Sequence, residues 1–118
     1  MGWIVPFRSM ATLESWLEEF RRIGYPIGDT AKVIQQDGEL GADTGLVAVK
    51  LTNSSRVTYM QPHHPGAMEW VVTLEPHEAP EVLSSAEVHR LATELSMVSA
   101  LCVFLETKSR AFVGDDRG

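Results

Sequence analysis

The sequence is poor in the residue types that tie a protein to the secretory route. Its single cysteine, Cys102, lies in the apolar run VSALCVFL, so an intrachain disulfide is excluded and a reducing compartment is expected. The first ten residues, MGWIVPFRSM, contain no basic leader followed by a long apolar core, so no secretory signal is predicted. We therefore expect a cytoplasmic protein.

Long hydrophobic runs and basic clusters are also scarce. The longest mainly apolar stretch, Met97 to Leu105, is too short for the ~20 apolar residues that a membrane-spanning helix needs, so no membrane partner is expected. Ten basic residues stand against sixteen acidic ones, and the net charge of −6 repels phosphate backbones. No basic stripe interleaved with aromatic residues compensates, so the sequence predicts no nucleic-acid partner.

No complete catalytic, nucleotide-binding or metal-binding motif occurs. The glycines do not form a phosphate-loop or dinucleotide fingerprint, and there is no G-x-S-x-G turn of a serine hydrolase. The loop at 37–45, DGELGADTG, fails as a calcium loop because Ala42 and Ala48 stand where a glycine and a bidentate glutamate are required. Cys102 lies on an apolar stripe, where a thiol stays protonated and packs in the core. No cofactor is predicted, and the question of enzymatic activity stays open.

The four histidines do not form a predicted metal site. A structural zinc site needs four nitrogen or sulfur ligands. His63 and His64 precede an expected strand at 68–74, whereas His77 follows it, so roughly 23 Å of extended chain separates the two groups. No metal is therefore predicted.

The segment EPHEAPE, residues 75–81, has two interpretations. Its acidic residues lie near His77 and His89, and carboxylates close to a histidine favour its charged form, as in an acid/base pair. The alternative is an exposed acidic linker, which we favour because catalytic groups need a shaped pocket. The carboxylates concerned are Glu75, Glu78, Glu81 and Glu87.

Hydrophobic periodicity predicts two helices around four strands. The first helix begins with Thr12 as its cap and ends at Gly24. Four segments with strand character follow, and their short connections require antiparallel pairing. Ser84 and Glu87 form a capping box for a long helix that runs to about Lys108. The four strands are expected at residues 30–36, 45–52, 56–60 and 68–74.

The long C-terminal helix is predicted to be apolar on two sides. One stripe steps by three and four residues through Val88, Leu91, Leu95, Val98, Cys102 and Leu105, and a second comprises Met97, Leu101 and Phe104. A helix with two apolar sides buries each side against a different partner. We expect one partner to be the sheet and the other to be either the first helix or a second copy of the chain. A competing interpretation makes residues 101–113 a strand hairpin.

These elements predict an α+β fold in the order α-β-β-β-β-α. The expected architecture is a single domain over residues 1–113, with a four-stranded antiparallel meander and both helices on one face. Residues 114–118 are predicted to be a flexible tail. The open sheet face is expected to carry mixed residues such as Lys50, Thr58, Glu69, Val71 and Thr73, where a ligand or partner can bind.

Two functional hypotheses follow. The first is a non-catalytic protein-interaction module that acts as a homodimer, joined by the doubly apolar C-terminal helix or by a sheet edge. It is based on the surplus of apolar surface on residues 95–105 in a chain that lacks catalytic motifs. The second is a small-molecule-binding protein or minor enzyme with a pocket between the sheet and the helices, near His63 and His64. Its ligand-binding residues are predicted to be His63, His64, Tyr59 and Glu69, while the predicted interface residues are Met97, Leu101, Phe104 and Trp3.

Overall fold

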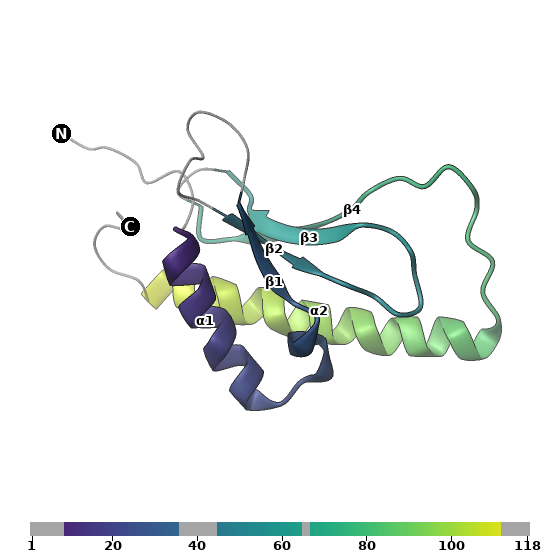
Figure 1. Cartoon of the computed structure of the whole chain (residues 1–118), viewed down its shortest axis with the longest axis horizontal. Coiled ribbons are helices and arrows are strands. Elements are labelled where there is room, and N and C mark those ends of the chain that lie inside the picture. The colour runs from purple at the N-terminus through teal and green to yellow at the C-terminus, as the bar shows by residue number, and fades with distance from the viewer. Residues whose placement is uncertain (1–8, 36–44, 65–66, 112–118) are drawn as a thin grey trace.

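The computed structural model describes residues 9–35, 45–64 and 67–111, and it confirms the predicted order of helices and strands (Figure 1). The strands form one antiparallel sheet in the order β1-β2-β3-β4, and both helices cover the same face of it. Trp3, the loop at 37–44 and the predicted tail at 114–118 lie outside the described residues. The elements are α1 (Met10–Ile23), a short 3₁₀ helix η1 (Pro26–Asp29), β1 (Lys32–Gln35), β2 (Gly45–Val49), β3 (Thr58–Pro62), β4 (Trp70–Leu74) and α2 (Ser85–Ala111).

Helix α1 buries the apolar stripe that its periodicity predicts, through Leu13, Trp16, Leu17 and Phe20. Its N-cap is Ser9 and not Thr12, because Ser9 has the extended backbone that a cap requires and its Oγ accepts a hydrogen bond of 3.2 Å from the Thr12 N–H. The helix ends at Gly24, as predicted, with a φ of 103° that glycine adopts at little cost.

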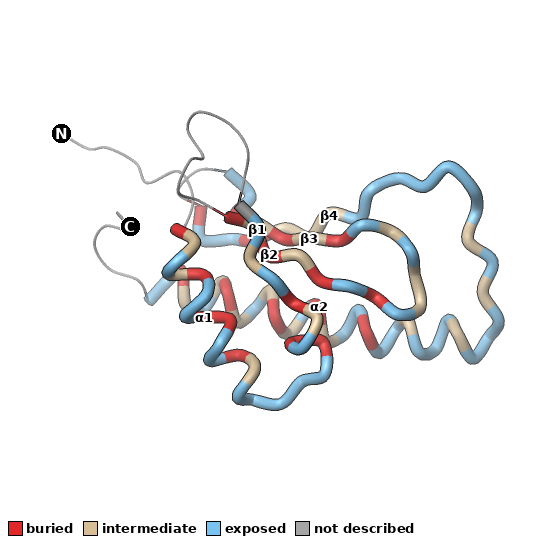
Figure 2. Tube along the Cα trace, in the orientation of Figure 1, coloured by how far each residue is buried: buried red, intermediate tan, exposed pale blue. Residues whose placement is uncertain are grey.

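Buried and less buried residues alternate along β2 and β3 (Figure 2), so the two faces of the sheet differ in burial. The face toward the helices holds Val47, Val49, Met60 and Trp70, all buried. Thr58 also lies on this face and is 1% exposed, so its predicted place on the open face is wrong; its hydroxyl donates to the Arg56 carbonyl oxygen at 3.1 Å, which satisfies it inside the core. The register places Lys32, Ile34, Leu46, Ala48, Tyr59, Gln61, Val71 and Thr73 on the open face.

Helix α2 begins at the predicted capping box. The Ser84 N–H donates to Glu87 Oε1 at 2.8 Å, and the Glu87 N–H donates to Ser84 Oγ at 3.1 Å. The helix continues to Ala111, so the alternative of a strand hairpin is wrong over residues 101–111, and residues 112 and 113 lie outside the described part of the chain.

Helix α2 packs on the sheet with one side and on α1 with another. Val98, Leu101 and Leu105 are buried in the core. Phe104 contacts α1, where its ring centroid lies 5.4 Å from that of Phe20. Phe104 of the second apolar stripe therefore packs against the first helix of the same chain.

Helix α2 also holds the edge strand β4 at Trp70. The Trp70 indole N–H donates to Ser109 Oγ at 2.9 Å, and its backbone N–H donates to Glu106 Oε2 at 3.1 Å. The Cys102 thiol donates to the Trp70 carbonyl oxygen at 3.5 Å. Burial, assisted by the negative charge of Glu106, raises the pKa of Cys102 to about 11, so this thiol is protonated at neutral pH and has a packing role.

The expectation of no membrane partner was based on the apolar stretch Met97 to Leu105 alone. The helix that contains this stretch, α2, is 27 residues long. By length and composition alone this helix is sufficient to cross a membrane. The core helix of a soluble protein passes the same test, so this is weak evidence for a membrane location.

Candidate functional site

A cleft of about 640 Å³ lies where the β2–β3 turn meets the linker that joins β4 to α2. The turn comprises residues 50–57 and the linker residues 75–84. Side chains from both segments and from the first turn of α2 line the cleft. They are Lys50, Leu51, Thr52, Asn53, Ser54, Ser55, His77, Pro80, Glu81, Val82, Leu83 and Glu87.

Glu94 of α2 fixes the first half of the turn. Its carboxylate accepts hydrogen bonds from the Thr52 N–H and hydroxyl, both at 2.7 Å, and from the Asn53 N–H and side-chain amide at 3.0 and 2.9 Å. Burial disfavours the charged form of Glu94, but these four hydrogen bonds outweigh burial and lower the pKa of its carboxyl. The turn predicted at Asn53–Ser55 is thus held by a buried anion.

Glu81 of the linker fixes the second half of the turn. Its carboxylate accepts hydrogen bonds from Ser54 Oγ at 2.8 Å and from the Ser55 N–H at 3.2 Å, and lies 3.9 Å from Arg56 Nε. The hydrogen bond from the Ser54 hydroxyl is the main reason that the pKa of Glu81 lies below its ordinary value. The acidic linker is therefore attached to the turn.

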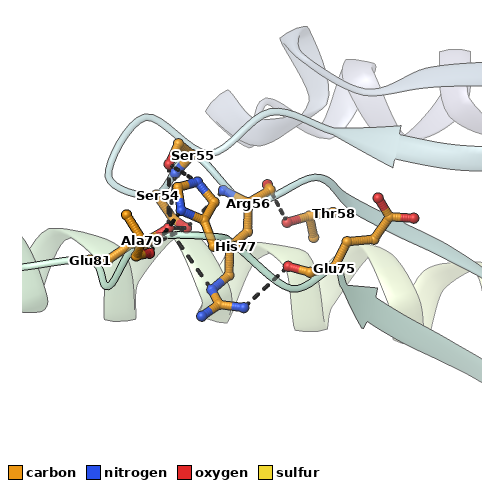
Figure 3. A network of polar contacts seen from close by, with 8 residues as sticks. All are labelled: Ser54, Ser55, Arg56, Thr58, Glu75, His77, Ala79 and Glu81. Atoms are coloured by element: carbon orange, nitrogen blue, oxygen red, sulfur yellow. Dashed lines mark hydrogen bonds and ion pairs between the residues drawn. The ribbon is translucent and has the colours of Figure 1, made fainter.

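His77 connects the same two segments and contacts Ser55 directly (Figure 3). Its Nδ1 lies 3.0 Å from the carbonyl oxygen of Ala79, and because a carbonyl oxygen only accepts hydrogen bonds, Nδ1 carries the proton. In the neutral ring Nε2 then has a free lone pair, and it lies 2.6 Å from Ser55 Oγ. In that form of the ring the Ser55 hydroxyl donates to His77.

The chemistry of this cleft is that of a hydroxyl beside a base, with charges of both signs around it. Glu81 and Glu87 provide negative charge, and both pKa values lie below the ordinary range. Lys50 lines the cleft and makes no ion pair among the described residues. Pro80, Val82 and Leu83 supply the apolar part of the wall.

The predicted ligand residues lie at the opposite end of β3 and β4. His63 and His64 directly follow β3 and are exposed, and their ring centroids lie 5.8 Å apart. The His63 N–H donates to the Glu69 carbonyl oxygen at 2.9 Å, so the fold brings these two residues together through their backbones. Tyr59 lies inside β3 on the open face, opposite Thr73, away from that end of the strand.

The second histidine cluster forms only in part. Glu87 accepts the hydrogen bond from the Ser84 N–H, which is the first cause of its lowered pKa, so its carboxylate serves the helix cap. His89 is exposed on α2. Within the described ranges, no group of three or more histidine, cysteine or acidic residues is placed to hold a metal ion.

The predicted interface residues are placed differently from one another. Leu101 is 0% exposed and packs inside its own chain. Met97 and Phe104 are partly buried against the same core, and Met97 lines a groove of about 330 Å³ together with Pro26 and Ile27. Trp3 lies outside the described residues.

The Ser55–His77 contact is a feature that sequence reasoning missed. The register pairs Thr58 with Leu74, and continuing it three residues further places Ser55 opposite His77. The sequence predicted an antiparallel hairpin for these strands but not its register. A shift of the register by one residue changes which side chains face each other.

Comparisons with protein-family models, with curated protein sequences and with solved structures found no match for this chain.

Proposed function

We propose that the protein acts by binding protein, as a homodimer joined through one exposed side of α2. This surface, the outer strip, consists of Val88, Ala92, Leu95, Ser99 and Val103. All five residues are exposed, and the three large ones are 52%, 37% and 54% exposed. At 3.6 residues per turn they share one side of the helix, away from the side on which Phe104 contacts α1.

The observation that carries the proposal is the absence of exposed charge along this part of α2. Between Leu91 and Leu105 the only charged residue is Glu94, which is 9% exposed and bound to the β2–β3 turn. Charged residues make up 22% of the chain, so a stretch of this length that exposes no charged side chain is unusual in this protein. Depletion of charge is the compositional mark of an interface core.

A second copy of the same strip is the partner that fits this surface. The strip offers no charge that an oppositely charged partner could complement. From Val88 to Val103 it is about 23 Å long, and two strips can face each other across a two-fold axis with the helix axes 8–10 Å apart, a spacing usual for packed helices. Leu95 then lies near the centre of the contact, where burial contributes most.

The test is a pair of lysine variants compared by sedimentation velocity. Leu95→Lys places two charges in the dimer contact, which is expected to weaken association at least about tenfold. Val82→Lys is the matched control, because Val82 is 89% exposed and lies outside α2. Monomeric behaviour of the unchanged protein at micromolar concentration, or equal association of the two variants, contradicts the proposal.

A second candidate function is the binding of a small molecule in the cleft at the β2–β3 turn. Its volume of about 640 Å³ is typical of ligand pockets, and Ser55 and His77 supply polar groups next to an apolar wall. We place the ligand here in preference to the exposed end at His63 and His64. A thermal-shift screen against metabolites tests this: a hit is expected to be lost in His77→Gln and kept in His64→Ala, and the reverse result moves the site to His64.

A further inference from the structure

We propose that Ser55 is a nucleophile activated by His77, and that the cleft accepts small uncharged acyl esters. This inference deepens the second candidate function and rests on it. The Ser55 hydroxyl, the His77 ring and the Ala79 carbonyl oxygen form a continuous series, with 2.6 Å between Oγ and Nε2 and 3.0 Å between Nδ1 and the carbonyl oxygen. A nucleophile, a base and a group that orients the base are the three parts that nucleophilic catalysis needs.

The orientation of His77 is set by contacts that do not involve the reaction. The Ala79 carbonyl oxygen fixes the proton on Nδ1, so Nε2 is the basic nitrogen and faces Ser55 (Figure 3). The backbone of Ser55 is held in turn, because its N–H donates to Glu81 at 3.2 Å. Glu81 Oε1 also lies 3.5 Å from Ser55 Oγ, a longer contact than that to His77. Both reacting side chains are therefore positioned before a ligand enters.

The reaction that this geometry supports is acyl transfer to Ser55. As Oγ bonds to the carbonyl carbon of the ester, the hydroxyl proton passes to His77 Nε2. The bond from that carbon to the alcohol oxygen then breaks, and Nε2 returns the proton to the leaving alkoxide. The products are an alcohol and acylated Ser55. Water, deprotonated by the same nitrogen, then bonds to the acyl carbon; the bond from that carbon to Oγ breaks, Nε2 returns the proton to Oγ, and the carboxylic acid is released.

The surroundings of Ser55 restrict the class of ester. Glu81 and Glu87 line the cleft and repel an anionic substrate. Lys50 is the cation on the cleft wall, and it supplies positive charge to a site in which attack creates a negative oxygen. Pro80, Val82 and Leu83 form an apolar wall for the hydrocarbon part. The chemistry favours an uncharged ester with a short apolar acyl group.

A fluorophosphonate probe tests the nucleophile directly. Attack by Ser55 on phosphorus forms an Oγ–P bond and releases fluoride, while the proton passes to His77, so the full chain gains the mass of one phosphonyl group. We expect peptide mapping to place that group on Ser55 and Ser55→Ala to remove it. The matched control is Ser96→Ala, since Ser96 is an exposed serine of α2 that does not line the cleft; this variant is expected to keep the labelling.

The dependence on His77 separates an activated serine from an exposed one. His77→Gln retains a side chain that can accept the Ser55 hydrogen bond but cannot take its proton, so labelling is expected to slow at least about 100-fold. Absence of an adduct on Ser55, or labelling at the same rate in His77→Gln, overturns the proposal. A ligand that shifts the melting temperature without any adduct at Ser55 supports the binding function alone.

Discussion

At the scale of single residues, Glu94 does the most to connect distant parts of the chain. It lies on α2, and all four of its hydrogen bonds go to Thr52 and Asn53 in the β2–β3 turn. Two of the donors are backbone N–H groups, and leaving such a group buried without an acceptor destabilises the folded state. The position of the candidate cleft thus depends on a carboxylate that does not line it.

Glu94→Gln is expected to destabilise the fold by about 2 kcal/mol, because a neutral amide replaces an ionised acceptor and turns its NH₂ group toward other donors. Chemical denaturation at neutral pH measures the loss. The matched control is Glu14→Gln on the exposed side of α1, for which a change of less than about 0.5 kcal/mol is expected. Equal stabilities of the two variants would show that the Glu94 contacts contribute nothing.

The pH dependence of stability follows from the same contacts. The pKa values of Glu81 and Glu94 are lowered from 4.5, so the unfolded chain binds protons more readily than the folded one. Their contribution is fully present above 4.5 and is lost as the pH falls through the lowered pKa values. The difference in stability between the unchanged protein and Glu94→Gln is therefore expected to shrink on acidification below 4.5. A constant difference down to pH 3 would contradict this.

At the scale of elements, local patterns predicted the helices and strands well. The capping box at Ser84 and Glu87 and the glycine stop at Gly24 act within a few residues of their own position, so the sequence alone locates them. Thr12 was wrongly predicted as the cap of α1 because Ser9, one turn earlier, can cap equally well by composition, and only the backbone conformation decides between them.

The apolar periodicity of α2 did not predict which side is covered. Val88 and Leu95 belong to the predicted core stripe, yet both are exposed, whereas Val98 and Leu105 of the same stripe are buried. The first turns of α2 extend beyond the sheet (Figure 1), and Leu95 lies on a different side of the helix from Val98 and Leu105. Periodicity shows that a side is apolar but not whether anything lies against it, since that depends on strand length and on the path of the linker. The outer strip could therefore not be recognised from the sequence.

Ser84→Ala is expected to loosen the first turn of α2. It removes the hydroxyl that accepts the Glu87 N–H, at a cost of about 1 kcal/mol. Amide hydrogen exchange measures the effect, and we expect faster exchange confined to residues 85–88. Ser96→Ala, an exposed change in the middle of the same helix, is expected to leave exchange in that turn unaltered. Faster exchange along all of α2 would show that the cap is not a local device.

At the scale of the whole molecule, the chain is a thin two-layer slab. Its Cα atoms extend over 54 × 32 × 18 Å, with one sheet and one layer of helices (Figure 2). Such a slab leaves much apolar surface uncovered relative to its core, and α2 contributes part of that surface as the outer strip. The association proposed above would bury this strip.

The measurement that tests the dimer most directly is the distance between spin labels on two copies of the protein. A nitroxide is attached at Ser99→Cys in a Cys102→Ser background, which keeps a hydroxyl donor for Trp70. Two facing outer strips place these labels within about 25 Å of each other, so a strong dipolar coupling is predicted. A label at Ser15→Cys on α1, which packs on another side of α2, is predicted to give a longer distance. No coupling at Ser99→Cys, or a shorter distance at Ser15→Cys, would contradict association through the outer strip.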